Sequence, residues 1–442
     1  MKNNAWRLLL AQLLTALFLA RAANAQISMR IIGPGTTTSP IAIPGLKNLG
    51  GDSQQRLSAA FVDTLRRDLT LSGLFRVIDP HAYVEDSQAT GYDLGQFNFA
   101  DWSSINATFL VKGGVEQRDG KVTLTAMLFD VGQQRRMMGK RFSGERRDMR
   151  EMARRFADAV MQAVTGQRGP FDTKLAYVST RGGRFKEIYV SPLDGHSLFR
   201  VTNNPTINLF PSFDRSARHL LYLSYKSGHP DLYLADLQAR REVRISNSLG
   251  EIIGGTLAPD GRTIAAAITR GGATNLYLLD TAGAQTRALT NNRAINVGPS
   301  FSTDGGEIAF TSDRSGTPQI YLMGLHGGAA RRITYRGNYN TNAALSPDGK
   351  WIAYQARQGS HFSIERIAAS GGEPVRLDDG IGSNTNPAWS PDGRYLVFSS
   401  TRGGRNHLYL MMVGAKSGKI TSRLTEDDGN ETNPVWSWWL GG

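Results

Sequence analysis

Residues 345–354 read LSPDGKWIAY, and residues 389–398 read WSPDGRYLVF. In each copy the proline presets φ at the second position of a turn, and aspartate and glycine suit the positions that follow. An apolar run of strand length comes next. The pattern therefore predicts a type I turn between two strands, and it assigns Asp348 and Asp392 to the turn rather than to catalysis.

The pattern recurs with a strict period. A tyrosine-bearing run and a short last segment keep the same period as the turn, so each unit holds four short strands; only Glu365 stands where a tyrosine is expected. Four antiparallel strands in about 40 to 50 residues is the period of a β-propeller, whereas a helical solenoid would show a period of about 3.6 residues. The apolar residue before each turn recurs at intervals of 44 residues, with a last interval of 47, at Phe213, Leu257, Phe301, Leu345, Trp389 and Trp436.

The two ends of the repeat region complete one another. The unit that begins at Lys174 lacks a first strand, and residues 434–436 form a first strand that lacks the other three. Five full units between Pro211 and Asn433, with this shared one, make six blades. Pairing the two ends closes the ring without exposing edge strands. We therefore expect an all-β six-bladed β-propeller over residues 169–442.

Residues 26–168 mix helical and strand periods, which predicts an α/β amino-terminal domain before the propeller. Apolar residues recur every four positions from Leu57 to Leu69, along a helix that Asp52 or Ser53 could cap. A second apolar stripe, from Met149 to Val164, marks a closing helix. The expected strands are residues 41–43 and 75–78 and a hairpin of residues 109–117 and 121–130, joined across Arg118-Asp119-Gly120.

The first 25 residues predict a cleaved export signal. Lys2 and Arg7 precede an apolar run, and small residues at 23–25 suit cleavage before Gln26. A membrane anchor is the alternative, but the run is shorter than the roughly 20 residues that a span needs and is ended by Arg21. With no cysteine in the chain, we expect no disulfide and no thiolate metal site. The export signal favours the periplasm.

The net charge is +13, and loss of Lys2, Arg7 and Arg21 leaves +10 for the mature chain. This excess suggests anionic neighbours in the envelope, and export argues against nucleic acid. The densest basic stretch, Arg135 to Arg155, also carries interleaved acidic residues. We interpret it as a solvated strand and helix face. We expect a monomer without a membrane span.

Motifs for catalysis are missing from the sequence. There is no GxSxG nucleophile elbow, no HExxH or comparable metal spacing among the seven histidines, and no phosphate-binding loop. We therefore expect neither an enzyme nor a cofactor or metal site, although a site assembled from distant blades would escape a motif search.

One set of positions, mostly amides, recurs three residues ahead of each predicted first strand. We expect these positions in loops around one mouth of the central channel, where they could bind a partner. Equally, asparagine suits such turns because it bonds its own backbone and accepts left-handed φ. The recurring positions are Asn208, Ile252, Asn296, Asn340, Asn384 and Glu431. Neighbouring donors and acceptors are Thr341, Asn342, Thr385, Asn386, Thr432 and Asn433.

The whole arrangement resembles the TolB family, the periplasmic propeller proteins of the Tol-Pal system of Gram-negative bacteria. The resemblance covers the export signal, an arm before the first domain, the α/β domain, the Gly169-Pro170-Phe171-Asp172 junction and six blades of the SPDG type. The order of these parts is more specific than the blades alone. The resemblance implies a protein that links inner-membrane TolA to outer-membrane Pal, maintains outer-membrane integrity and supports envelope constriction during cell division.

The same resemblance implies which residues bind each partner. The TolA-binding arm would be Gln26, Ile27, Ser28, Met29, Arg30, Ile31, Ile32, Gly33 and Pro34. The Pal-binding propeller face would include Asn208, Glu251, Gly254, Asn296, Val297, Asn340, Thr341, Asn342, Asn384, Thr385, Asn386, Glu431, Thr432 and Asn433. The alternative functions are a periplasmic propeller that binds an envelope glycan or peptide, and a degenerate hydrolase.

Overall fold

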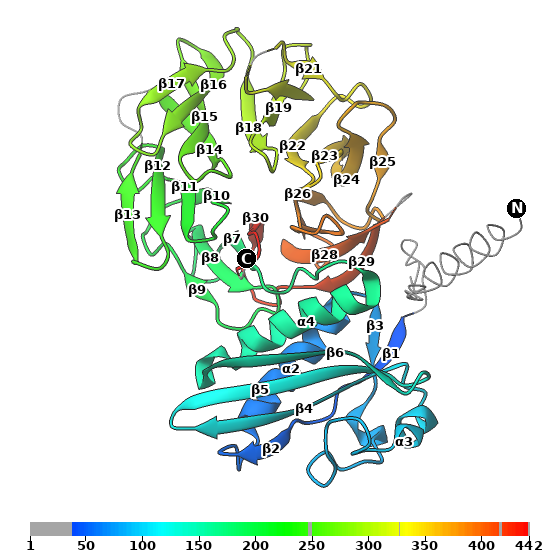
Figure 1. Cartoon of the computed structure of the whole chain (residues 1–442). Helices are drawn as coiled ribbons and strands as arrows, with labels where there is room; N and C mark the ends of the chain where they lie inside the picture. The colour runs from blue at the N-terminus through cyan, green and yellow to red at the C-terminus, as the bar shows by residue number, and fades with distance from the viewer. Residues whose placement is uncertain (1–37, 246–249, 327, 415–417, 441–442) are drawn as a thin grey trace, which may run out of the picture.

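The computed structural model describes residues 38–245, 250–326, 328–414 and 418–440 (Figure 1). The predicted export signal, residues 1–25, and the predicted arm, Gln26 to Pro34, lie outside the described residues. Within the described part of the chain, no helix is both long and apolar enough to cross a membrane. The structure comprises a mixed α/β domain followed by a six-bladed β-propeller (Figure 1).

The amino-terminal domain is a sheet with helices packed on one face. Its strands lie in the order β3-β1-β4-β5-β6, and β2 also pairs with β4. Helices α2 (Arg56–Leu71) and α4 (Met149–Thr165) cover one face, and the segment that contains η1 (Pro80–Ala82), α3 (Phe99–Ser104) and buried Trp102 covers part of the other. The strands are β1 (Ser39–Ala42), β2 (Lys47–Gly50), β3 (Phe75–Val77), β4 (Phe109–Arg118), β5 (Lys121–Asp130) and β6 (Arg135–Glu145), and η2 (Arg146–Asp148) leads from β6 into α4.

Both predicted helices and the predicted hairpin are confirmed. The carboxylate of Asp52 accepts hydrogen bonds from the backbone N–H groups of Leu57 and Ser58, at 3.0 Å each, and so satisfies the first turn of α2. In the hairpin, Asp119 and Gly120 take left-handed φ values of 52° and 78°, as a two-residue turn between twisted strands requires. Strand β2 was not predicted, because four residues with no buried side chain give no periodic signal.

The propeller has six sheets of four antiparallel strands, as expected. In every blade the strands follow one another outward from the central channel (Figure 1). Blade one comprises β10 (Asn208–Phe213), β11 (His219–Ser224), β12 (Asp231–Asp236) and β13 (Arg241–Arg244), and blade two β14 (Glu251–Leu257), β15 (Thr263–Arg270), β16 (Ala273–Asp280) and β17 (Gln285–Ala288). Blade three comprises β18 (Asn296–Phe301), β19 (Glu307–Ser312), β20 (Gln319–Gly324) and β21 (Arg331–Arg332), and blade four β22 (Asn340–Leu345), β23 (Trp351–Gln358), β24 (His361–Ala368) and β25 (Val375–Arg376). Blade five comprises β26 (Asn384–Trp389), β27 (Tyr395–Ser400), β28 (His407–Val413) and β29 (Gly418–Arg423).

Blade six joins the two ends of the repeat region. Its inner strand is β30 (Glu431–Trp436), and its other strands are β7 (Lys174–Ser179), β8 (Glu187–Pro192) and β9 (Phe199–Arg200). Strand β30 pairs antiparallel with β7, with Trp436 opposite Leu175. The predicted closure of the ring is confirmed.

The aspartates of the turn motif form turns, as predicted. In the motif at residues 346–349 the N–H of Gly349 donates to the carbonyl of Ser346 at 2.9 Å, and Gly349 has φ of 68°. The carboxylate of Asp348 accepts from the Ser346 hydroxyl at 2.6 Å and from the Lys350 N–H at 3.1 Å. These bonds engage the carboxylate within the turn itself.

Five of the six blades stack a cation on the tyrosine of the third strand, and blade four replaces this contact. In blade four the Glu365 carboxylate accepts from Tyr354 Oη at 2.8 Å and from Gln358 Nε2 at 2.9 Å. Because Glu365 has no aromatic ring to attract a cation, blade four has these two hydrogen bonds where the other blades have a cation–π contact. The stacked pairs are Arg181–Tyr189, Lys226–Tyr233, Arg270–Tyr277, Arg314–Tyr321 and Arg402–Tyr409.

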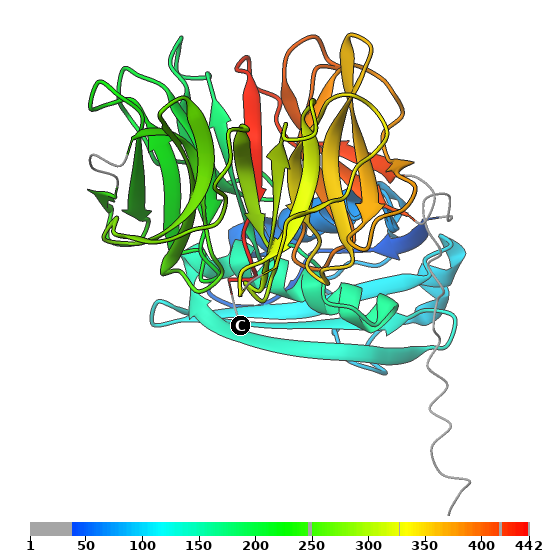
Figure 2. The same cartoon turned by 90° about the horizontal axis from the view of Figure 1, so that it is seen from above.

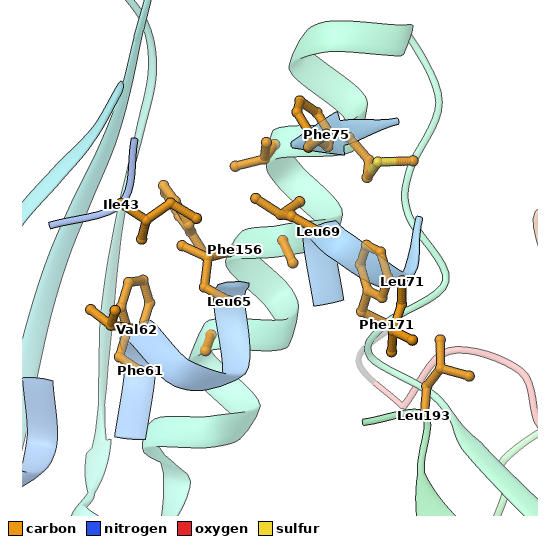
Figure 3. Close-up of a cluster of buried hydrophobic side chains, with 14 of the residues drawn as sticks. Ile43, Phe61, Val62, Leu65, Leu69, Leu71, Phe75, Phe156, Phe171 and Leu193 are labelled. Carbon is orange, nitrogen blue, oxygen red and sulfur yellow. The ribbon is translucent and has the colours of Figure 1, made fainter. Parts of the chain in front are cut away.

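The two domains share one core. Phe171, from the connection between them, and Leu193, from the propeller, belong to the same buried cluster as Leu71 of α2 (Figure 3). A buried ion pair also crosses the junction, because Arg154 Nη2 of α4 contacts both oxygens of Asp194 at 2.9 and 3.0 Å. The domains are therefore held together by apolar packing and by charge.

Two further carboxyl groups are buried near this ion pair. Asp68 is fully buried, and neither of its carboxylate oxygens has a hydrogen-bond partner among the described residues. Burial, with the nearby Asp194 carboxylate, raises the pKa of Asp68 well above its usual range. Burial also raises the pKa of Asp158 to about 7, although its carboxylate accepts a hydrogen bond from the Phe171 N–H at 2.8 Å.

This junction predicts a pH dependence of stability. The raised pKa of Asp158 makes the folded protein bind more protons than the unfolded chain between pH 3.8 and about 7, so the free energy of unfolding should fall as pH rises through that window. One such group contributes at most about 1.4 kcal/mol per pH unit. Urea denaturation at several pH values should show a smaller slope in Asp158→Asn. The matched control is Asp63→Asn, on the exposed side of α2, which should keep the parental slope. An unchanged slope in Asp158→Asn would contradict the assignment.

Candidate protein-binding face

The recurring positions predicted to ring the channel in loops lie instead at the starts of inner strands. We call the end of the channel where these strands begin the mouth. Ile252, the second residue of its strand, is also buried, whereas the adjacent Glu251 is exposed. The prediction that these six positions lie in loops is therefore wrong. Buried first residues of inner strands are Asn208, Asn296, Asn340, Asn384 and Glu431.

Four of these five buried polar side chains join their blade to the preceding one, whereas Asn384 bonds within the loop that leads into its own strand. Asn296 Nδ2 donates to the Thr274 carbonyl at 2.9 Å, and Asn340 Nδ2 donates to Gln319 Oε1 at 2.8 Å. In each pair the partner belongs to the third strand of the preceding blade. A buried amide without such a bond would be costly, so the sequence repeats the amide because the blade contact repeats. The remaining contacts are Asn208 Nδ2 to the Lys186 carbonyl at 2.9 Å, Asn384 Nδ2 to the Ile381 carbonyl at 3.4 Å, and Glu431 Oε2 with His407 Nδ1 at 3.1 Å.

Two residues further along, the inner strands carry a bulge at the mouth. The register between the first and second strands shifts there in every blade. In five of the six blades the bulge contains a residue with a left-handed backbone, which asparagine and glycine accept and which an aromatic residue adopts at a cost in strain. The turn interpretation of asparagine thus applies here, and not to the buried first residues. Left-handed φ values of 50° to 61° occur at Phe210, Gly298, Asn342, Asn386 and Asn433.

A cavity of about 540 Å³ opens at the mouth, between the inner strands. Among the described residues that line it there is no carboxylate, imidazole or cationic side chain. Its walls are backbone, hydroxyl and amide groups with apolar side chains, which suit binding better than acid–base chemistry. The predicted face residues that line it are Gly254, Val297, Thr341, Asn342, Asn386 and Asn433. Thr385 and Thr432 are half-buried on the same strands, outside this lining.

Exposed apolar side chains surround the cavity. Eight of the fourteen exposed large hydrophobic residues in the described part of the chain lie at this end of the propeller, so exposed apolar side chains are concentrated there. Phe210 is among them, with 39% of its surface exposed despite the strain of its left-handed backbone. The eight residues are Ile207, Phe210, Tyr225, Ile253, Ile295, Tyr335, Tyr339 and Ile381.

These eight exposed residues were not predicted from the sequence, although a signal was present in it. Ile207, Ile295 and Tyr339 each stand immediately before a recurring asparagine. An apolar residue at a fixed place before a strand reads as part of that strand's core. Only the structure shows that these positions face solvent.

The amino-terminal domain packs at the opposite end of the channel. Figure 2 shows this domain lying against one end of the propeller. The turn motif of blade five reaches it, since Arg394 Nη2 donates to the Arg168 carbonyl at 2.9 Å. Tyr395 Oη, from the following strand, donates to the Ser72 carbonyl at 3.0 Å. Because the turns and the mouth are at opposite ends of the inner strands, the mouth is left open to a partner.

Both domains of the chain are similar to domains of known proteins. Residues 27–137 match the TolB amino-terminal domain, and residues 161–440 match the TolB beta propeller domain. The Tol-Pal system protein TolB of Syntrophotalea carbinolica is 38% identical over 209 residues, which cover 47% of this chain and 48% of that protein. The protein of the same name from Desulfosudis oleivorans is 36% identical over 214 residues, which cover 48% and 49% respectively. The chain spans about half the length of the curated relatives that it matches.

A solved structure supports the same fold. The crystal structure of TolB from Acinetobacter baumannii has a TM-score of 0.78 and 24% identity, and covers 92% of this chain and 98% of that one. At this identity the likeness concerns the fold. The family match to the propeller extends over more than half of the chain. The chain therefore belongs to the TolB family.

Proposed function

We propose that this protein is a periplasmic, non-catalytic component of a Tol-Pal system that binds Pal at the mouth of its propeller and TolA through residues 26–34. By linking TolA at the inner membrane to Pal at the outer membrane, it would maintain outer-membrane integrity and support constriction during cell division. Membership of the TolB family supports a role in a Tol-Pal system, and the exposed apolar side chains at the mouth support the proposal that Pal binds there.

The mouth carries this proposal because it has the features of a protein-binding face. It is concave, it is open, and its rim combines aromatic and aliphatic side chains. Interfaces gain most of their affinity from a few such anchors that become buried on binding. Among the residues predicted for Pal, those lining the cavity can touch a partner directly, whereas the buried first residues would act by holding the blades in place.

The arm proposal rests on the resemblance alone, since residues 26–34 lie outside the described residues. If the arm has a bound and a free state, Pal can change the balance between them only by binding one state more tightly than the other. TolA and Pal would then be energetically linked through this protein.

Binding of purified Pal and TolA domains to single-site variants tests both contacts. Ile295→Asp and Tyr339→Asp should each weaken Pal binding by about tenfold or more, because a charge is placed in an apolar contact, while TolA binding is retained. Deletion of residues 26–34 should instead abolish TolA binding while Pal binding is retained. Isothermal titration calorimetry measures both affinities.

The matched control for the mouth is Val243→Asp, on the outer strand of blade one, where the valine is 54% exposed. It should leave both affinities at the parental value. Equal loss of Pal binding in the control and the mouth variants, or no loss in either, would refute the Pal site. An arm deletion that spares TolA, or abolishes both interactions, would refute the arm assignment.

A further inference from the structure

The amino-terminal sheet ends in a long, exposed edge strand. Strand β6 pairs with β5 on one side, and no further strand of the described residues pairs with its other side. We call this second side the β6 edge. In an antiparallel ladder alternate residues point their N–H and C=O groups away from the partner strand, so the β6 edge presents a row of backbone donors and acceptors.

The β6 edge lacks most of the features that keep other edges from pairing. Edge strands are usually short or interrupted by proline. By contrast, β6 has 11 residues and no proline, which gives an edge roughly 35 Å long, and its one irregularity is a register shift near Met137. Residues 139–141 are all exposed, so the middle of the strand is open on both faces of the sheet.

Besides this register shift, the charge of the strand protects the edge, and the same charge determines which partner the edge can bind. Arg135, Arg136, Lys140 and Arg141 lie on this strand, and its only acidic residue is Glu145, at the last position. Of these four cations, Arg136 pairs with Asp93 at 3.4 Å, and the Asp148 carboxylate accepts from the Glu145 N–H at 2.7 Å at the end of the strand. Among the described residues, neither Lys140 nor Arg141 has an ion-pair partner within 4.0 Å. Two copies of this edge would repel one another, whereas a segment of opposite charge would be attracted.

We propose that the β6 edge binds an extended acidic segment of another protein by strand addition. The backbone of the segment would satisfy the outward N–H and C=O groups, and its carboxylates would pair with the exposed cations. An anionic lipid or polymer could meet the charge but could not extend the ladder. This contact is distinct from the mouth of the propeller and does not depend on the function proposed above.

The test uses a fluorescein-labelled peptide of ten residues in which glutamate alternates with valine. Fluorescence anisotropy with the full chain should show saturable binding that weakens as salt rises from about 50 to about 200 mM, because the charges are exposed. The double variant Lys140→Glu/Arg141→Glu should weaken binding by about tenfold or more. The matched control Arg241→Glu/Arg262→Glu changes two exposed arginines of the propeller and should stay within about twofold of the parent.

A second peptide separates strand addition from simple charge attraction. N-methylation of alternate residues leaves every carboxylate in place but removes the N–H groups that extend a ladder, so its binding should fall as far as that of the double variant. Hydrogen exchange should show new protection at β6 amides with the first peptide only. Equal binding of both peptides, equal loss in both double variants, or self-association of the chain through β6 would overturn the proposal.

Discussion

Deletion of residues 433–442 should prevent the propeller from closing. The deletion removes four of the six residues of β30. Among them is Trp436, which is 7% exposed and donates from Nε1 to Thr173 Oγ1 at 2.7 Å. It also removes Trp439, which donates to the Gly169 carbonyl at 2.7 Å and so ties the end of the chain to the junction between the domains. Strand β7 would then present an unpaired edge inside the ring. We expect loss of the cooperative thermal transition by circular dichroism, and aggregation on size exclusion.

Two substitutions of Trp436 should lower the free energy of unfolding by different amounts. Trp436→Ala should cost about 3 to 5 kcal/mol of the free energy of unfolding, as truncation of a buried aromatic residue does. Trp436→Phe keeps most of the packing but loses the hydrogen bond to Thr173. Loss of this hydrogen bond should lower the free energy of unfolding by about 1 kcal/mol, in addition to the packing lost with the smaller ring. Parental melting of the deleted chain would show that blade six does not need its inner strand, and would contradict the closure of the ring by β30.

Replacement of Arg154 by methionine should destabilise the junction by about 3 to 5 kcal/mol, the usual cost of removing one partner of a buried ion pair. Arg154 is 8% exposed and Asp194 is 1% exposed. Without the guanidinium, the Asp194 carboxylate would remain buried close to the Asp68 carboxyl group, with no arginine to offset its charge. Urea denaturation measures the loss, and limited proteolysis of residues 166–173 should report loosening of the domains.

The double variant Arg154→Met/Asp194→Asn provides the matching test. It removes both charges while the asparagine can still accept from the His196 N–H, so it should recover much of the lost stability. Arg147→Met is the control for loss of an arginine, because the Arg147 side chain is 80% exposed in its pair with Glu145 and should contribute at most about 1 kcal/mol. If Arg154→Met and Arg147→Met were equally stable, the buried pair of Arg154 and Asp194 would not be what holds the junction together.

The candidate site was only partly predictable from the sequence. The strand that begins at Asn340 was expected near the mouth, and it lies there, but its first side chain is buried against Gln319 of the preceding blade. The same residue type two positions later, Asn342, lines the cavity. A single repeat of the sequence does not distinguish these two environments, since each depends on a strand from another blade.

Local chemistry in the sequence was sufficient for the number of blades, the turn at Ser346-Pro347-Asp348-Gly349, and the stripes of α2 and α4, because turn preferences and periodicity act over a few neighbouring residues. The shared sixth blade followed from counting strands. Tertiary contacts alone decided which end of the channel is open, which polar repeats are buried, and that β6 has a free edge. Each of these features depends on residues far apart in the chain, such as Tyr395 and Ser72, whose proximity no local pattern encodes.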